Sequence, residues 1–228
     1  MTQITDLRTL IPTLQTQPPR VIFFDAMGTL FGLKQSVGEV YTAIAKDYQV
    51  RVNAEQINQV FYSTFQAAPP LAFGPLPAIE LAQKEFDWWQ NLAKSVFATL
   101  GVLMDFQDFN AYFTDLYGHF MTPDPWWIYP DVFPLLDTCQ TRHMPLSVIS
   151  NFDSRLLKIL ELLGLAPYFQ QIFISSRCLT AKPDRHIFQQ ALEHYQIAPE
   201  QAWHIGDSQR EDYLGAQAVG MQAFLLKR

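Results

Sequence analysis

Side chains suited to phosphate chemistry follow four apolar segments of this sequence. The stretch FFDAMGTL (residues 23–30) places Asp25 at the end of an apolar run, and Gly28-Thr29 opens a turn behind it. Later runs are followed by Ser150 and Asn151, by Lys182, and by Asp207 and Ser208 with Asp212 beyond. Carboxylates on separate strands suit a hard cation such as Mg²⁺, while a lysine and a hydroxyl suit phosphoryl oxygens. A carboxylate beside Mg²⁺ is placed to attack phosphorus, which indicates phosphoryl transfer through an aspartyl-phosphate.

These residues must be positioned by a parallel sheet. Five short apolar runs are predicted as strands: 21–25, 146–150, 172–175, 203–205 and 222–226. Their apolar residues are continuous rather than alternating, which is typical of strands buried on both faces. Helical patterns at 153–163, 184–195 and 210–219 separate the later runs. This order predicts an α/β fold with a doubly wound, Rossmann-like parallel sheet, in which ligands bind beyond the carboxyl ends of the strands.

One long interval lacks any pattern of a buried strand. Between residues 33 and 119 helical patterns recur, at 37–48, 54–66, 79–100 and 106–117, with several prolines between the second and the third. We therefore predict an α/β core made of residues 1–32 and 120–228, and an inserted all-helical cap domain at 33–119. A leader with Leu7, Leu10, Ile11 and Leu14 at helical spacing precedes the first strand and is predicted to pack on the core.

The composition excludes several classes of function. The formal net charge is −6 and no Lys/Arg run occurs, so neither nucleic acid nor an anionic membrane is expected as a partner. The two cysteines cannot form a disulfide framework, and the N-terminal segment does not have the pattern of a secretory signal. No apolar run approaches the ~18 residues of a membrane-spanning helix. We expect a soluble cytoplasmic protein that acts on a small phosphorylated substrate, and no feature indicates an oligomeric state.

Four motifs carry a resemblance to a known family. FFDAMGTL, VISNFDSRL, AKPDRHIF and HIGDSQREDYLGAQAVGM resemble, in order, the four motifs of the haloacid dehalogenase-like hydrolase superfamily. The helical insertion after the first motif resembles the subfamily IA, whose helical C1 cap stands at this position. DAMGTLFG with VGEVY, and SNFDSRL, look most like the branch related to rhythmically expressed gene proteins. The resemblance extends from about residue 20 to 221 and implies the α/β core with a helical cap.

The resemblance also implies a role for each matching residue. The implied catalytic residues are Asp25, as nucleophile, and Lys182, which balances the charge of nucleophile and phosphate. The implied ligands of Mg²⁺ are Asp25, the backbone carbonyl of Met27, and Asp207. The implied groups around the substrate are Thr29, Ser150, Asn151 and Lys182. Ser208 and Asp212 are expected behind the metal ligands, where Asp212 acts through water.

The sequence departs from this pattern at Met27. Phosphatases of the family carry a second aspartate there, which protonates the leaving alkoxide and then activates water. Methionine has no proton to give, and general acid–base catalysis contributes roughly 10²–10⁴ in rate. The loss should be severe for alkyl phosphates and smaller for acyl or aryl phosphates, whose leaving groups need less help. The metal site need not be lost, because a backbone carbonyl survives any change of side chain.

Three interpretations follow. We predict a Mg²⁺-dependent phosphatase of low activity, acting on a small phosphorylated metabolite and taking its acid from elsewhere. The alternative is a weak or inactive protein that binds a phosphorylated metabolite or a protein partner. Less favoured are a phosphonatase-like hydrolase, to which Lys34 or Lys46 could offer a Schiff base, and a dehalogenase-like hydrolase. The Gly206-Asp207 pair argues against the dehalogenase, because an extra acid would repel a carboxylate substrate.

Purely structural roles are the alternative for several of these residues. Asp25 alone could cap a turn, Asp207 could cap the helix predicted at 210–219, and Ser150-Asn151 could form a turn before the next helix. His186, His194 and His204 lack a Cys or His partner at metal-ligand spacing, so we predict satisfied core or surface histidines. The order of the four motifs favours function for Asp25 and Asp207.

Overall fold

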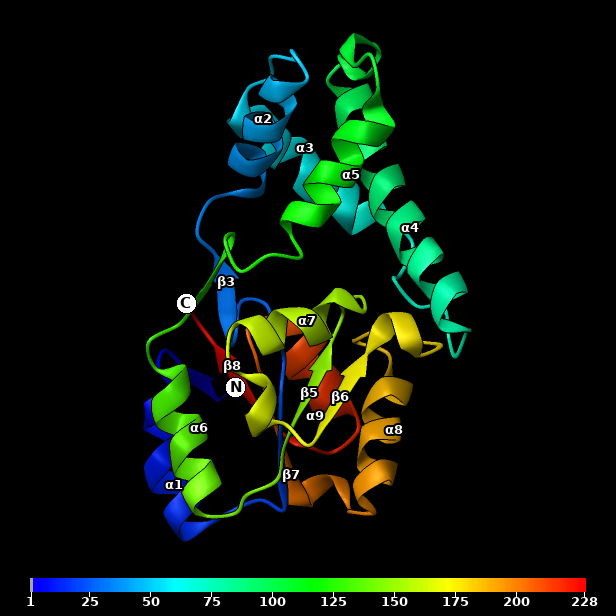
Figure 1. Ribbon diagram of the computed structural model, residues 1–228. Helices are drawn as coiled ribbons and strands as arrows, with labels where there is room; N and C mark the ends of the chain where they lie inside the picture. Colours follow the sequence, from blue (N-terminus) through cyan, green and yellow to red (C-terminus); the bar gives the residue numbers. More distant parts are fainter. Residues whose placement is uncertain (1) are drawn as a thin grey trace. The chain divides into compact units, whose positions relative to one another are not determined.

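A six-stranded parallel sheet forms the centre of one of the two units into which the chain divides. The computed structural model describes residues 2–228, and the strand order is β1-β8-β7-β2-β5-β6 (Figure 1). The strands are β1 (Gln3–Ile4), β2 (Val21–Phe24), β5 (Leu146–Ser150), β6 (Gln171–Ile174), β7 (Ala202–Gly206) and β8 (Gln222–Leu226). Every pairing in this sheet is parallel. The predicted α/β fold with a parallel, doubly wound sheet is confirmed.

The sheet register brings the carboxyl ends of three strands together. Phe24 of β2 pairs with Val148 of β5 on one side and with Ile205 of β7 on the other. All four residues of β2 are buried. Phe23 belongs to a core cluster with Ile187 and Phe188 of α8, so one face of β2 lies under this helix. The residues that follow β2, β5 and β7 therefore meet at one edge of the sheet.

Helices flank the sheet in the same unit of the chain. They are η1 (Leu7–Leu10), α1 (Ile11–Thr16), α6 (Val132–Thr141), α7 (Arg155–Leu162), α8 (Arg185–Tyr195) and α9 (Gly215–Ala218), with short 3₁₀ turns η3 (Ala166–Tyr168), η4 (Ser175–Arg177) and η5 (Pro199–Gln201). Figure 1 shows α1 and α6 together on one side and α8 on the other. The helix predicted at 210–219 is divided, because a π-helix, η6 (Gln209–Leu214), precedes α9.

The second unit of the chain is helical, as the periodicity predicts. Its helices are α2 (Val37–Asp47), α3 (Ala54–Ala67), α4 (Ala78–Thr99), η2 (Leu103–Asp105) and α5 (Phe109–His119). Its core is rich in aromatic rings, including Tyr41, Phe97 and Tyr112. A capping box at Ser36 and Glu39 starts α2. Aromatic packing of this kind buries a large apolar area in a small unit.

The boundaries of the two units differ from the predicted 33–119. The helical unit comprises Leu33–Pro70 and Pro77–Trp126, while Leu71–Leu76 belongs to the unit of the sheet. The N–H groups of Phe73 and Gly74 donate to the carbonyls of Ser176 and Cys178, at 3.2 and 2.9 Å, which fastens this segment beside η4. Residues 120–126 belong with the helices because rings such as Phe120 pack there. Two short strands, β3 (Phe31–Leu33) and β4 (Trp126–Ile128), pair separately.

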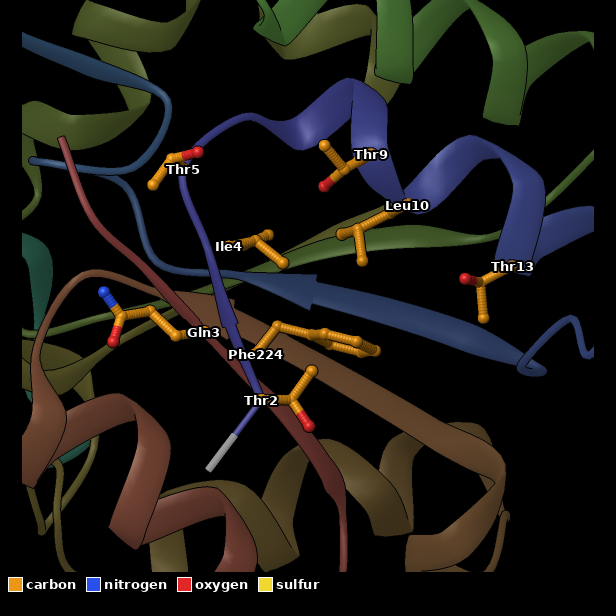
Figure 2. Close-up of a pocket in the computed structure, with 8 residues that line it drawn as sticks. All are labelled: Thr2, Gln3, Ile4, Thr5, Thr9, Leu10, Thr13 and Phe224. Atoms are coloured by element: carbon orange, nitrogen blue, oxygen red, sulfur yellow. The ribbon is translucent and has the colours of Figure 1, made fainter.

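The leader packs on the sheet as predicted for Leu7, Leu10 and Leu14, which are all buried. A cavity of about 470 Å³ lies between the leader and the edge strand β1 (Figure 2). Its described lining residues are Thr2, Gln3, Ile4, Thr5, Thr9, Leu10, Thr13 and Phe224. None of these eight side chains is ionisable, so this cavity does not suit phosphoryl chemistry. Within residues 2–228, no helix is long and apolar enough to cross a membrane.

Candidate active site

Asp25 lies at the carboxyl end of β2, where two other strands also end. Its N–H donates to the carbonyl of Ile205 at 2.9 Å, which extends the ladder to β7 by one residue. Its Oδ1 accepts hydrogen bonds from Lys182 Nζ at 2.7 Å and from Ser150 Oγ at 3.2 Å. Burial raises the pKa of Asp25, and the Lys182 ammonium opposes that rise. The structure thus brings together the predicted nucleophile, lysine and hydroxyl.

The turn behind Asp25 is built around one carbonyl and one glycine. The carbonyl of Ala26 accepts from the N–H groups of Thr29, Leu30 and Phe31 at 3.3, 2.8 and 3.3 Å. Gly28 has φ +86°, and a Cβ there would lie 2.5 Å from Asp207 Oδ2, so any side chain would collide with that carboxylate. A tight turn beside the carboxylate therefore requires glycine at position 28.

Thr29 and Met27 have different surroundings within this turn. Thr29 is fully buried, and its Oγ1 donates to Asp207 Oδ1 at 3.4 Å. Met27 is 37 % exposed, so its apolar side chain stands partly in solvent. The role of the Met27 carbonyl as a metal ligand stays a prediction.

Asn151 holds the backbone of Lys182. Its Nδ2 donates to the carbonyl of Lys182, and its Oδ1 accepts from the N–H of Lys182, both at 2.8 Å. Nδ2 also lies 3.3 Å from Glu211 Oε2. Since both ends of the amide are engaged within the protein, Asn151 fixes the lysine loop, and its contact with a substrate stays a prediction. Two backbone bonds of this kind set where the Lys182 side chain starts.

Lys182 joins two carboxylates inside the protein. Besides Asp25, its Nζ contacts Asp212 Oδ1 at 2.5 Å, and its side chain is 1 % exposed. Burial disfavours the charged form, but Asp212 and Asp25 outweigh burial, so the pKa of Lys182 is raised and it remains an ammonium. Lys182 therefore contacts the predicted nucleophile directly, and its contact with a phosphate stays a prediction.

Asp212 contacts Lys182 directly and accepts from the N–H of Ser208 at 2.9 Å. Its expected action on a metal through water stays a prediction. Burial alone would raise its pKa, but the charge of Lys182 and the hydrogen bond with His204 outweigh burial, and the pKa is lowered. The π-helix explains this placement, because the N–H groups of Asp212 and Tyr213 both bond to the carbonyl of Ser208 at 3.1 Å, which widens the turn. Ser208 itself caps this helix through its side chain.

His204 is a neighbour of the site that the motif spacing did not reveal. Its Nε2 lies 3.0 Å from Asp212 Oδ1, and its ring packs edge-on against Phe188. Burial lowers its pKa. Its Nδ1 is buried without a hydrogen-bond partner among the described residues, so the predicted satisfied core histidine is only half satisfied. Strand alternation in β7 was the available signal, since His204 and Gly206 share the face that meets Asp212.

Three carboxylates form one cluster at this edge of the sheet. One oxygen from each of Asp25, Asp207 and Asp212 lies within 4.8 Å of the others. Burial, and next the charge of Asp25, raise the pKa of Asp207 to about 7. With Lys182 as the cation in contact, negative charge remains in excess. A cluster of this composition fits a hard divalent cation such as Mg²⁺, which takes carboxylate oxygens.

A sequence profile described as haloacid dehalogenase-like hydrolase matches residues 19–220. The chain belongs to this hydrolase family. A Bos taurus protein called haloacid dehalogenase-like hydrolase domain-containing protein 3 is 34% identical over 207 residues, which cover 91% of this chain and 81% of the relative. The rhythmically expressed gene 2 protein of Drosophila melanogaster is 28% identical over 218 residues, covering 91% and 82%. The resemblance seen in the four motifs, including the branch, is confirmed.

Solved structures of the haloacid dehalogenase-like family share the fold. A phosphatase of this family from Thermococcus onnurineus aligns with TM-score 0.61 and 21% identity, covering 91% of this chain and 86% of that one. The protein YfnB of Bacillus subtilis, solved bound to magnesium, aligns with TM-score 0.62 and 20% identity, covering 90% and 87%. At such identities the likeness establishes the fold, so the chemistry of this hydrolase must be argued from its own residues.

Proposed function

We propose that this hydrolase is a Mg²⁺-dependent phosphatase that acts on a small phosphorylated metabolite through an aspartyl-phosphate on Asp25. One observation carries the proposal. The Asp25 carboxylate is held by Lys182 and Ser150 and shares its surroundings with two further carboxylates. A nucleophile of this kind needs a cation that offsets the negative charge of a phosphate, and three neighbouring carboxylates suit such a cation.

The residues that would hold Mg²⁺ are Asp25, Asp207 and the carbonyl of Met27, with Asp212 behind them on Lys182. Their chemistry fits the ion, because carboxylates whose pKa values are raised, as for Asp25 and Asp207, are short of positive charge. When bound, Mg²⁺ would supply that charge to the carboxylates and to the phosphoryl oxygens. Gly28 leaves room for the Asp207 carboxylate at this point.

The protein's own groups then divide the work. The side-chain hydrogen bonds described for Asp25 end on Oδ1, which leaves Oδ2 to attack phosphorus. The ester P–O bond breaks as the Asp25–phosphorus bond forms, and the leaving oxygen takes its proton from solvent. Water then attacks the phosphorus, which releases phosphate and restores Asp25. Lys182 remains protonated throughout, so it keeps Asp25 ionised and in place.

A second candidate function is favoured by Met27. Its side chain gives no proton to a leaving group, and it is partly exposed where that proton would be needed. A pocket that holds a phosphorylated metabolite or a partner without fast turnover agrees with this substitution. The two functions differ in turnover and not in binding, so one set of measurements separates them.

The test uses acetyl phosphate and p-nitrophenyl phosphate, with Mg²⁺ and with EDTA, on the wild type and Asp25→Asn. We expect slow, Mg²⁺-dependent release of phosphate that Asp25→Asn abolishes, together with a phosphoryl group trapped on Asp25 and detected by mass spectrometry. Asp47→Asn, on the exposed end of α2, is the matched control and should behave as wild type. Mg²⁺-dependent binding of these compounds without turnover would favour the binding protein instead.

A further inference from the structure

A second polar cluster lies on the far side of the turn behind Asp25. The guanidinium of Arg228, which follows β8, donates through Nη2 to the carbonyl of Thr29 and through Nη1 to Asp131 Oδ1 at 2.6 Å. The same guanidinium lies over the ring of Tyr129, 3.9 Å from its centroid. The Arg228 side chain is 17 % exposed and that of Asp131 only 3 %. An arginine that is stacked on a ring and donates to two separate acceptors is fixed in position.

Asp131 ties this arginine to a third segment of the chain. Its Oδ2 accepts from the N–H of Leu7, the first residue of η1, at 2.8 Å. Both carboxylate oxygens are therefore engaged, one by a backbone donor and the other by Arg228. Segments from the leader, from the stretch after β4 and from the end of β8 thus converge on one point. That point is the carbonyl of Thr29.

Thr29 connects this cluster to the carboxylates of the active site. Its carbonyl faces Arg228, its N–H donates to Ala26, and its hydroxyl donates to Asp207. The residue is fully buried, so each of these contacts is made away from bulk solvent. Whatever sets the carbonyl of Thr29 therefore also sets the hydroxyl that reaches Asp207.

We propose that Arg228 is a positioning residue of the active site, which fixes the turn 26–31 from behind and thereby places Thr29 and Asp207. The proposal rests on the proposed function only where turnover is measured. Without the guanidinium, the carbonyl of Thr29 loses a donor and Asp131 keeps a buried charge with one oxygen unpaired. Buried acceptors in that state draw in water, so the turn loosens. This loosening displaces the Asp207 carboxylate, which is separated from the carbonyl carbon of Thr29 by about three covalent bonds and one hydrogen bond.

The test compares Arg228→Gln, Arg228→Lys and the control Arg8→Gln. Arg8 is an exposed arginine of the same unit, and it pairs with Asp6 in the leader. Three quantities are measured in the full chain: amide hydrogen exchange of peptides covering 26–31, Mg²⁺ affinity by calorimetry, and kcat and KM for acetyl phosphate. Exchange in α8 serves as the internal reference for a local effect.

For Arg228→Gln we expect faster exchange in 26–31 with α8 unchanged, and Mg²⁺ binding about tenfold weaker. We expect kcat to fall about tenfold with KM changed less than threefold, because misplacement acts on the reacting groups. Arg228→Lys should recover part of each effect, since an ammonium reaches Asp131 but lacks the planar fork. Arg8→Gln should match wild type.

Unchanged exchange in 26–31 overturns the proposal, and so does faster exchange with wild-type Mg²⁺ affinity and kcat. If the wild type binds Mg²⁺ without turnover, the proposed function fails while exchange and Mg²⁺ affinity still decide the role of Arg228. If the wild type does not bind Mg²⁺, both proposals fail.

Discussion

Replacing Lys182 with methionine removes the ammonium that joins Asp25 and Asp212 while it keeps most of the aliphatic stem. Lys182 Nζ lies 2.7 Å from one carboxylate and 2.5 Å from the other, and its side chain is almost fully buried. Methionine fills a similar volume, so the substitution tests charge rather than packing. In the variant, two buried carboxylates face each other with no cation in contact.

The size of the expected loss in the free energy of unfolding follows from the burial of Lys182. Breaking a buried ion pair by removing one partner costs about 3–5 kcal/mol, because the remaining charge is left uncompensated. After burial, Lys182 is the largest influence on the pKa values of Asp25 and Asp212, and it lowers both. Both pKa values rise in its absence. When the pKa of a carboxyl is higher in the folded than in the unfolded protein, the free energy of unfolding falls as the pH increases. The variant should therefore lose more of its free energy of unfolding at pH 8 than at pH 5.

Mg²⁺ should reduce the difference in the free energy of unfolding between Lys182→Met and the wild type. The variant's cluster carries one more negative charge than that of the wild type, and a divalent ion bound there offsets part of it. An ion at 100 times its Kd stabilises the folded protein by about 2.7 kcal/mol, and tighter binding adds to this. The free energy of unfolding is measured in urea at both pH values, with and without Mg²⁺. Circular dichroism and tryptophan fluorescence are recorded together, because their coincidence tests two-state unfolding.

The matched control is Lys158→Met. Lys158 pairs with Glu161 at 3.2 Å on the surface of α7, where both side chains are more than half exposed. Exposed pairs contribute about 0–1 kcal/mol, so this variant should differ little from wild type. A loss below about 1 kcal/mol for Lys182→Met in EDTA at pH 8, or a loss that Mg²⁺ does not reduce, would refute the reasoning about the cluster.

Three further predictions concern the same edge of the sheet. Met27→Asp should raise kcat for alkyl phosphates by about 10²-fold and for aryl phosphates by much less, since only poor leaving groups need the acid; equal gains would show that residue 27 does not face the leaving group. Because the pKa of Asp207 is about 7 without metal, protons and Mg²⁺ compete for its carboxylate. Mg²⁺ affinity measured by calorimetry should therefore rise about tenfold per pH unit up to about pH 7 and then level off. Asp207→Asn should remove this pH dependence. Gly206→Ala places a Cβ 2.1 Å from Asp212 Cγ and should lower the free energy of unfolding by about 1–3 kcal/mol. The control Gly118→Ala, whose Cβ has nothing within 4 Å, should not lower it. A Gly206→Ala variant with the stability and Mg²⁺ affinity of the wild type would contradict the tight placement of Asp212.

The strands of the core could be predicted because of how they are buried. β2, β5 and β8 lie inside the sheet, so their sequences read as continuous apolar runs. The edge strand β1 has only two residues, too few for any pattern. α6 was not predicted, although its buried residues Val132, Leu135, Leu136 and Cys139 recur at helical spacing and Pro134 lies in the first turn, where proline is tolerated. Complete burial over several residues is what made the inner strands predictable.

The site shows the same division. The residues directly after β2, β5 and β7 could be predicted to meet, because parallel strands end at one edge. The direct contact of Asp212 with Lys182 could not be predicted, since it depends on a π-helix, in which backbone hydrogen bonds join residues five apart instead of four. Arg228 and Asp131 lie 97 residues apart without a motif at either position. Contacts of that kind follow from packing of distant segments, which a single sequence does not encode as a local pattern.

Met27 affects one part of the proposed reaction and leaves another part unaffected. The side chains that hold the Asp25 carboxylate, the proposed nucleophile, are Lys182 and Ser150, and neither contact involves residue 27. In the proposed mechanism, capture of a phosphoryl group therefore depends on an arrangement that the methionine leaves intact. Protonation of the leaving oxygen and activation of water are the proposed steps that would lose a partner. An aspartate nucleophile kept ready while its acid is missing agrees best with a substrate whose leaving group is already a good one, such as an acyl phosphate.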